Sequence, residues 1–119
     1  MSHFNAIEST HKYGTIFSYS NIELHDLATK IENLLLGEGY RIDGGGLGDA
    51  MFVKGDSTMR MLFGAFVKFY KLRVVTSKND DGQCLVDLRD ATPELSGGLI
   101  GIKQTRKEIE RLKSLFSAI

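Results

Sequence analysis

Apolar residues recur at helical spacing in two parts of the chain. From Leu24 to Leu35 they fall at every third or fourth position, which predicts an amphipathic helix. Ser20-Asn21-Ile22-Glu23 just before it predicts a capping box, and Gly37 and Gly39 follow its last turn, where glycine is favoured. The second helix is predicted from about Ile102 to the C-terminus. The residues of its core-facing stripe are Thr105, Ile109, Leu112, Phe116 and Ile119.

The remaining periodic segments alternate or are rich in β-forming residues, which predicts strands. The first is Thr15 to Tyr19, before the first helix. Those between the helices are Tyr40 to Asp43, Asp49 to Val53, Thr58 to Phe63, Val67 to Ser77 and Cys84 to Ala91. The first of these is interrupted by the flexible run Gly44 to Gly48. The pattern predicts an α+β fold in which an antiparallel sheet of about five strands packs on two helices, in the order β-α-β-β-β-β-α.

The element order resembles that of TATA-binding-protein-like domains and of short helix-grip (START-like) domains. No motif specific to either family accompanies the order, so the resemblance implies a fold and no function. TATA-binding-protein-like domains read DNA with a basic, aromatic sheet face, which this chain shows only in part. At 119 residues, the length favours one domain spanning 1–119.

The charge of the chain argues against nucleic acid and anionic lipid as partners. The 15 basic and 15 acidic side chains cancel, so the whole chain has no electrostatic attraction to nucleic acid or anionic lipid. The basic and aromatic run Arg60 to Arg73 is typical of single-strand nucleic-acid binding, but it is better interpreted as two core strands with outward cations. We therefore expect no nucleic-acid partner.

The apolar runs, the first residues and the cysteine content favour a cytoplasmic location. No apolar run approaches the length of a membrane span, and residues 1–5 lack the basic and apolar regions of a signal peptide. We expect no integral membrane association. Cys84 is the only cysteine, which excludes an internal disulfide and fits a reducing compartment.

Familiar catalytic and metal-binding patterns are absent from the sequence. His3, His11 and His25 have no cysteine or carboxylate at metal-ligand spacing. No Gly-x-Ser-x-Gly motif or recognisable carboxylate pair is present. We therefore expect no metal, no cofactor and no catalytic residue of a familiar kind, and an enzyme of unfamiliar mechanism stays only as a third hypothesis.

A glycine-rich segment precedes or begins the last helix. Its backbone amides can bind an anion with help from the helix dipole, and the candidate residues are Gly97, Gly98, Gly101 and Lys103. The Gly-Lys-Ser/Thr ending of a Walker A loop is missing. The favoured interpretation is structural, with the glycines packed closely against the sheet, or inside a helix that starts at Thr92-Pro93-Glu94.

The leading functional hypothesis concerns the sheet face that the helices leave uncovered. If Tyr70, Leu72 and Val74 face the helices, their neighbours on the same strand point the other way. The residues predicted for an interface are Phe69, Lys71, Arg73, Val75, Leu85 and Asp87. Aromatic and aliphatic side chains among these charges indicate a non-catalytic interaction or regulatory domain that forms a homodimer or higher homo-oligomer, with Phe69 at the centre.

The alternative hypothesis is a domain that binds a small apolar ligand or lipid. Its cavity is placed between the sheet and the last helix. The residues predicted to line the cavity are Met51, Met61, Phe63 and Phe116. Methionine fills irregular cores as readily as it lines pockets, so the sequence leaves both hypotheses open.

Overall fold

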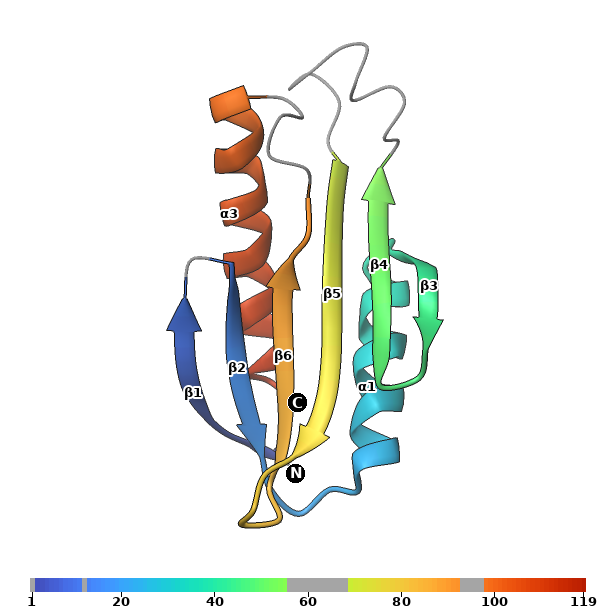
Figure 1. Ribbon diagram of the computed structural model, residues 1–119, viewed down its shortest axis with the longest axis vertical. Helices are drawn as coiled ribbons and strands as arrows, with labels where there is room; N and C mark the ends of the chain where they lie inside the picture. The colour runs from blue at the N-terminus through green and yellow to red at the C-terminus, as the bar shows by residue number, and fades with distance from the viewer. Residues whose placement is uncertain (1, 12, 56–68, 93–97) are drawn as a thin grey trace.

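The computed structural model describes residues 2–11, 13–55, 69–92 and 98–119. Within these residues the chain forms strands and helices in the order β-β-α-β-β-β-β-α (Figure 1). The elements are β1 (Phe4–His11), β2 (Gly14–Tyr19), α1 (Leu24–Gly37), β3 (Arg41–Gly46), β4 (Asp49–Gly55), β5 (Phe69–Lys78), β6 (Cys84–Asp90) and α3 (Gly98–Phe116). The predicted α+β class is confirmed, with one additional strand at the start.

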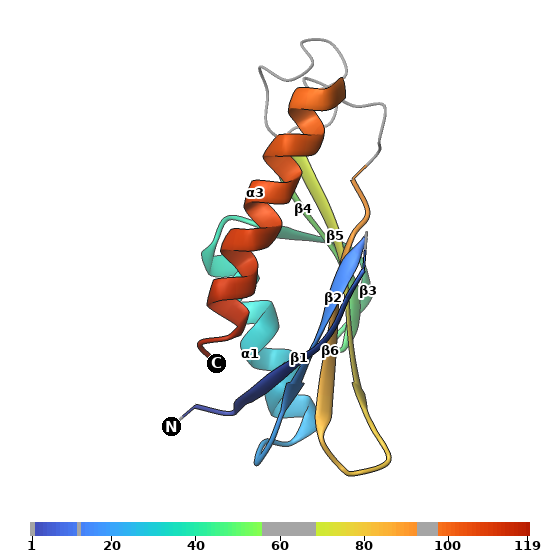
Figure 2. The same cartoon turned by 90° about the vertical axis from the view of Figure 1, so that its left-hand side faces the viewer.

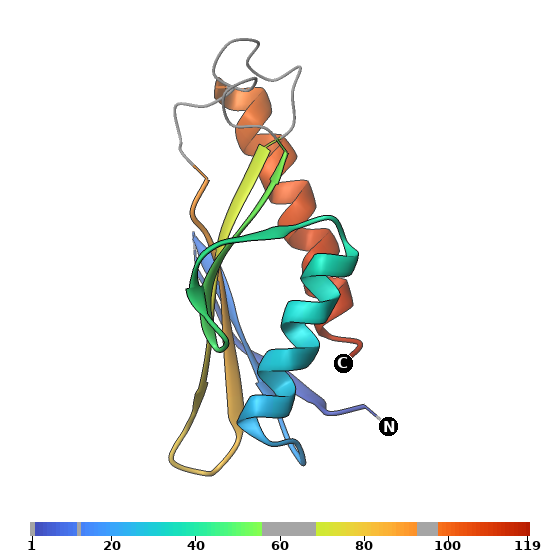
Figure 3. The same cartoon turned by 90° about the vertical axis from the view of Figure 1, so that its right-hand side faces the viewer.

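The six strands form one antiparallel sheet in the order β1-β2-β6-β5-β4-β3. Both helices lie against the same face of this sheet, as the two side views show (Figures 2 and 3). In the view of Figure 1, α3 lies toward β2 and β6, and α1 lies toward β4. The structure therefore has two layers. We call the sheet face opposite the helices the outer face.

The hydrophobic core lies between the sheet and the two helices. The alternation predicted for β5 and β6 is present, because every residue expected to face the helices is buried in one cluster with residues of α1 and α3. These strand residues are Tyr70, Leu72, Val74, Cys84, Val86 and Leu88. From α1 the cluster includes Leu27 and Ile31, and from α3 it includes Leu112 and Phe116.

The start of α1 differs from the predicted capping box. The helix begins at Leu24, and Glu23 occupies the N-cap position without a side-chain capping bond. The chain turns sharply at Asn21, which has a φ of 59°, and the Ser20 amide donates to the carbonyl of His3 at 2.9 Å. Ser20 is therefore tied to the N-terminal segment and does not cap the helix. At the other end, Gly39 has the expected positive φ, 93°.

Three strand assignments also differ from the sequence pattern. The sequence did not predict β1, because most of its residues are exposed and it lacks apolar alternation; its Phe4 packs on the rings of Phe17 and Tyr19. Strand β3 continues to Gly46 across the predicted interruption. The predicted strand Thr58 to Phe63 lies outside the described residues.

Strand β3 continues across the glycines because Gly45, which has no Cβ, lets the backbone of β3 approach the backbone at Asp49 closely. Gly45 has a φ of 85°, and a Cβ added there would lie 2.3 Å from the carbonyl oxygen of Asp49.

We expect Gly45→Ala to lower the free energy of unfolding by about 2 kcal/mol, because the alanine would strain the backbone and clash with Asp49. Chemical denaturation measures this change. Gly46→Ala is the matched control, because a Cβ at Gly46 meets nothing within 4 Å; equal losses for both variants would contradict this account.

Candidate functional site

A small group of side chains occupies the middle of the outer face. The register places Asp87 on β6 directly between Ile16 on β2 and Val75 on β5. Leu85 lies on the same face, two residues before Asp87, and pairs with Ser18. We call Ile16, Val75, Leu85 and Asp87 the outer-face cluster. All four side chains are partly buried, although both helices lie on the opposite side of the sheet (Figures 2 and 3).

Asp87 is the polar member of the outer-face cluster. Its Oδ2 accepts a hydrogen bond from Arg89 Nε at 2.9 Å. Its Oδ1 is buried and accepts no hydrogen bond from any residue that the structure describes. Leaving such an acceptor without a donor costs about 1–3 kcal/mol in a typical protein. This carboxylate between aliphatic neighbours distinguishes the cluster from an ordinary solvated sheet face.

Charged side chains surround the outer-face cluster and pair within the chain. Arg73 donates two hydrogen bonds to Asp49, at 3.3 and 3.2 Å. Lys71 Nζ lies 3.6 Å from Asp43 Oδ2. Together with the pair of Arg89 and Asp87, these contacts pair three cations of the outer face with carboxylates, while Arg41, opposite Val53 on the same face, donates to the carbonyl of Gly55. The described part of this face therefore carries charges of both signs, most of them paired.

Phe69 does not have the exposure predicted for an interface residue. Its position in the register, opposite Gly55, places it on the outer side of the sheet. However, the side chain is already buried in the single chain, with 6% of its surface exposed. The expectation that Phe69 is the exposed centre of the face is therefore wrong. Alternation along a strand specifies the side on which a residue lies, but not what covers it.

The residues predicted to line an apolar cavity are not brought together. Met51 pairs with Arg73 and lies on the outer side of the sheet. Phe116 is fully buried on the helix side, where its ring lies 5.4 Å from that of Phe17. The sheet separates the two, which corrects their grouping. Met61 and Phe63 lie outside the described residues.

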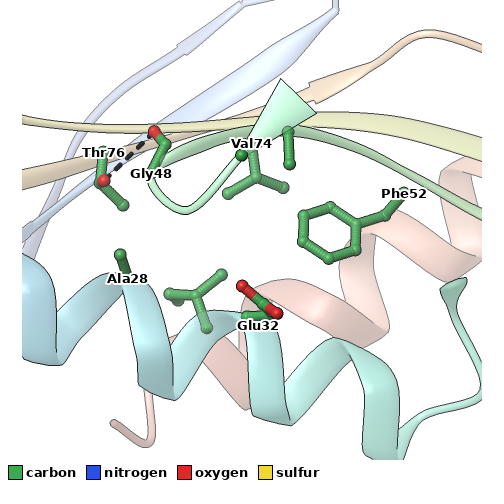
Figure 4. A pocket seen from close by; sticks show the side chains of 9 residues that line it. Ala28, Glu32, Gly48, Phe52, Val74 and Thr76 are labelled. Atoms are coloured by element: carbon green, nitrogen blue, oxygen red, sulfur yellow. Dashed lines mark hydrogen bonds between the residues drawn. The ribbon is translucent and has the colours of Figure 1, made fainter. Parts of the chain in front are cut away.

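A small hollow lies between α1 and the sheet (Figure 4). Ala28 and Glu32 border it from α1, and Phe52 and Val74 border it from the sheet. Its volume is about 10 Å³, which is space for roughly one water molecule. This hollow is therefore too small for an apolar ligand, and it adjoins α1 instead of the C-terminal helix.

The glycine-rich segment is at least partly helical. Helix α3 begins at Gly98, so Gly98 and Gly101 lie in a helix, but Thr92 is not helical, and Pro93 and Glu94 of the predicted helix start lie outside the described residues. Gly97 lies outside the described residues. Lys103 is exposed in the early part of α3. The described part of this segment is thus the first turns of a helix and not a loop.

A partly buried polar cluster that the sequence did not predict joins the end of α1 to α3. The Tyr40 hydroxyl donates to Glu108 Oε2 at 2.5 Å. Arg111 donates to both oxygens of Glu108, from Nε at 2.7 Å and from Nη2 at 2.9 Å, and it also bonds Glu38. Lys54 Nζ lies 3.9 Å from Glu108 Oε2 and 5.5 Å from the centre of the Tyr40 ring. We call these five residues the Glu108 cluster.

Burial and hydrogen bonding set the ionisation of the Glu108 cluster. Burial alone raises the pKa of Glu108, but hydrogen bonds from Arg111 and Tyr40 outweigh it, so the net pKa is lowered. Burial, together with the hydrogen bond to Glu108, raises the pKa of Tyr40. Glu108 is therefore a carboxylate and Tyr40 a neutral donor at neutral pH. The helical spacing of Glu108 and Arg111 is a weak sequence signal for this pair.

Among the described residues, no group of three or more His, Cys, Asp or Glu side chains is placed to hold a metal ion. None of the described helices is long and apolar enough to cross a membrane. No protein-family model, curated protein or solved structure matches the chain significantly.

Proposed function

We propose that the chain is an interaction or regulatory domain without catalytic activity that self-associates through its outer face. The observation that carries this proposal is the outer-face cluster. Ile16, Val75 and Leu85 surround a carboxylate oxygen that has no donor among the described residues. An apolar patch with a poorly satisfied polar group is a feature of surfaces that bind a partner.

A second copy of the chain is the partner that the charges favour. Among the described residues the outer face carries three cation–carboxylate pairs. In a two-fold contact the same patch meets itself, so a face that carries both signs of charge can bring cations of one copy toward carboxylates of the other. Arg73, which is half exposed beside Asp49, is the cation best placed to approach Asp87 of a second copy.

Substitution in the outer-face cluster tests the proposal. We expect Leu85→Glu to weaken association by about 2 kcal/mol or more, roughly thirtyfold, because it buries an unpaired charge in the contact. Chromatography with light scattering should show a folded monomer for this variant, with circular dichroism as the check on folding.

The matched control is Leu36→Glu, which makes the same chemical change at an exposed position on α1. Because α1 covers the other side of the sheet, this variant should associate like the native chain. Equal association of Leu85→Glu and the native chain would refute the proposed interface.

The proposal places the domain in the cytoplasm. Cys84 is the only cysteine, and its thiol is 1% exposed and donates to the carbonyl of Ile22 at 3.3 Å. Burial raises the pKa of this thiol, which keeps it protonated and unreactive. A single inert thiol is consistent with a reducing compartment.

A further inference from the structure

A groove whose described lining has more cations than carboxylates lies on the helix side of the sheet, away from the outer face. Lys54, Gly55 and Tyr70 form one wall, at the ends of β4 and β5. Gln104 and Lys107 belong to the opposite wall, on α3. The groove has a volume of about 740 Å³, which is within the usual range for small-molecule sites.

The Glu108 cluster forms one side of this groove and fixes its geometry. Glu108 is 8% exposed, and both of its oxygens are occupied by the bonds from Arg111 and Tyr40. The guanidinium of Arg111 also bonds Glu38. These contacts hold the α3 wall against the chain between α1 and β3, so the groove is built on paired and partly buried side chains.

The positive charge that remains comes from two lysines. The charge of Arg111 is balanced by its contacts with two carboxylates. Lys54 has a distant contact with the already occupied Glu108, at 3.9 Å. Lys107 is exposed, and no carboxylate in the described part of the chain pairs with it. The groove thus presents ammonium groups that still lack a close anion.

We propose that this groove binds a small molecule through a phosphate group, with Lys54 and Lys107 as its ligating cations. The planar fork of a guanidinium suits a carboxylate, but Arg111 already uses its fork on Glu108. Compact ammonium groups act as point charges, and they favour the near-double charge of a phosphate over the single charge of a carboxylate. The bonds of Glu108 with Tyr40 and Arg111 hold α3 in place, and with it the side of the groove that carries Lys107.

The test is a titration of the isotopically labelled native chain, followed by the amide signals in NMR. Inorganic phosphate and acetate are compared at constant pH and ionic strength. We expect saturable shifts at Gly55, Gln104 and Lys107 with phosphate, and no saturation with acetate. Shifts that grow linearly with phosphate, or equal binding of acetate, would overturn the proposal.

Two lysine variants on the same helix locate the site. Lys107→Gln should weaken phosphate binding about tenfold, the loss expected for one charge-assisted hydrogen bond. Lys103→Gln should leave it unchanged, because Lys103 is exposed on α3 but does not line the groove. Weakening by Lys103→Gln alone would move the site to the glycine-rich start of α3. Leu85→Glu should bind phosphate normally, so failure of the interface proposal and failure of this one are separable.

Discussion

Phe116→Ala is expected to lower the free energy of unfolding by about 4 kcal/mol, because it removes a large side chain from the core. Phe116 is fully buried, and its ring packs on Phe17 at 5.4 Å. Its backbone carbonyl also accepts the Tyr19 hydroxyl at 2.7 Å. Truncation leaves a cavity where α3 meets β2, and chemical denaturation measures its cost.

Ile102→Ala provides the control on the same helix. Ile102 is 37% exposed, so its truncation should change stability by less than about 1 kcal/mol. A small loss at Phe116, similar to that at Ile102, would show that Phe116 lines an open space, as the cavity hypothesis requires. A large loss at Phe116 alone confirms its place in the core.

Glu108→Ala is expected to cost about 3 kcal/mol of stability, because it removes the acceptor of the buried Tyr40 hydroxyl and of the Arg111 guanidinium. The Tyr40 hydroxyl loses its acceptor, and Arg111 keeps only Glu38. Because Arg111 is 40% exposed, water can replace its lost bonds, and most of the cost comes from the Tyr40 hydroxyl that is left buried without an acceptor. Urea denaturation monitored by circular dichroism measures the loss.

Glu110→Ala is a matched control for this substitution. Glu110 lies on the same helix, and it pairs with Lys113 at the exposed surface, where 70% of its side chain is accessible. Exposed pairs of this kind contribute little, so the expected change is below about 0.5 kcal/mol. Equal losses at Glu108 and Glu110 would mean that the buried hydrogen bonds do not stabilise the fold.

The contribution of Glu108 should also depend on pH in a definite direction. Its pKa is lowered in the folded chain, because the bonds from Arg111 and Tyr40 outweigh burial. The unfolded chain therefore binds this proton more tightly, and stability is lost as the pH falls. The stability difference between the native chain and Glu108→Gln should be full above pH ~4.3, the ordinary glutamate pKa, and should shrink below it. A difference that is constant with pH would contradict the assignment.

The two-layer fold follows from patterns that a sequence carries locally. Alternation along β5 and β6 predicts that Leu72 and Val86 face the core, and both are fully buried. Helical spacing predicts the buried positions Leu112 and Phe116 of α3. These predictions succeed because strand and helix periods directly determine which side chains share a face.

The features that the sequence did not predict depend on contacts between distant residues. Strand β1 is defined by pairing with β2 and not by its own apolar pattern. The bond from Tyr40 to Glu108 joins residues 68 positions apart, and no local signal specifies such a contact. The position of Phe69 was predicted on the correct side of the sheet, but its burial depends on tertiary packing.

The mass of the native chain in solution tests the central claim of self-association most directly. Sedimentation equilibrium over a range of micromolar concentrations gives that mass without reference to shape. If two copies associate through the outer-face cluster, the mass should rise with concentration toward twice the 13.2 kDa of one chain. A mass that stays at 13.2 kDa up to high micromolar concentration would contradict the claim.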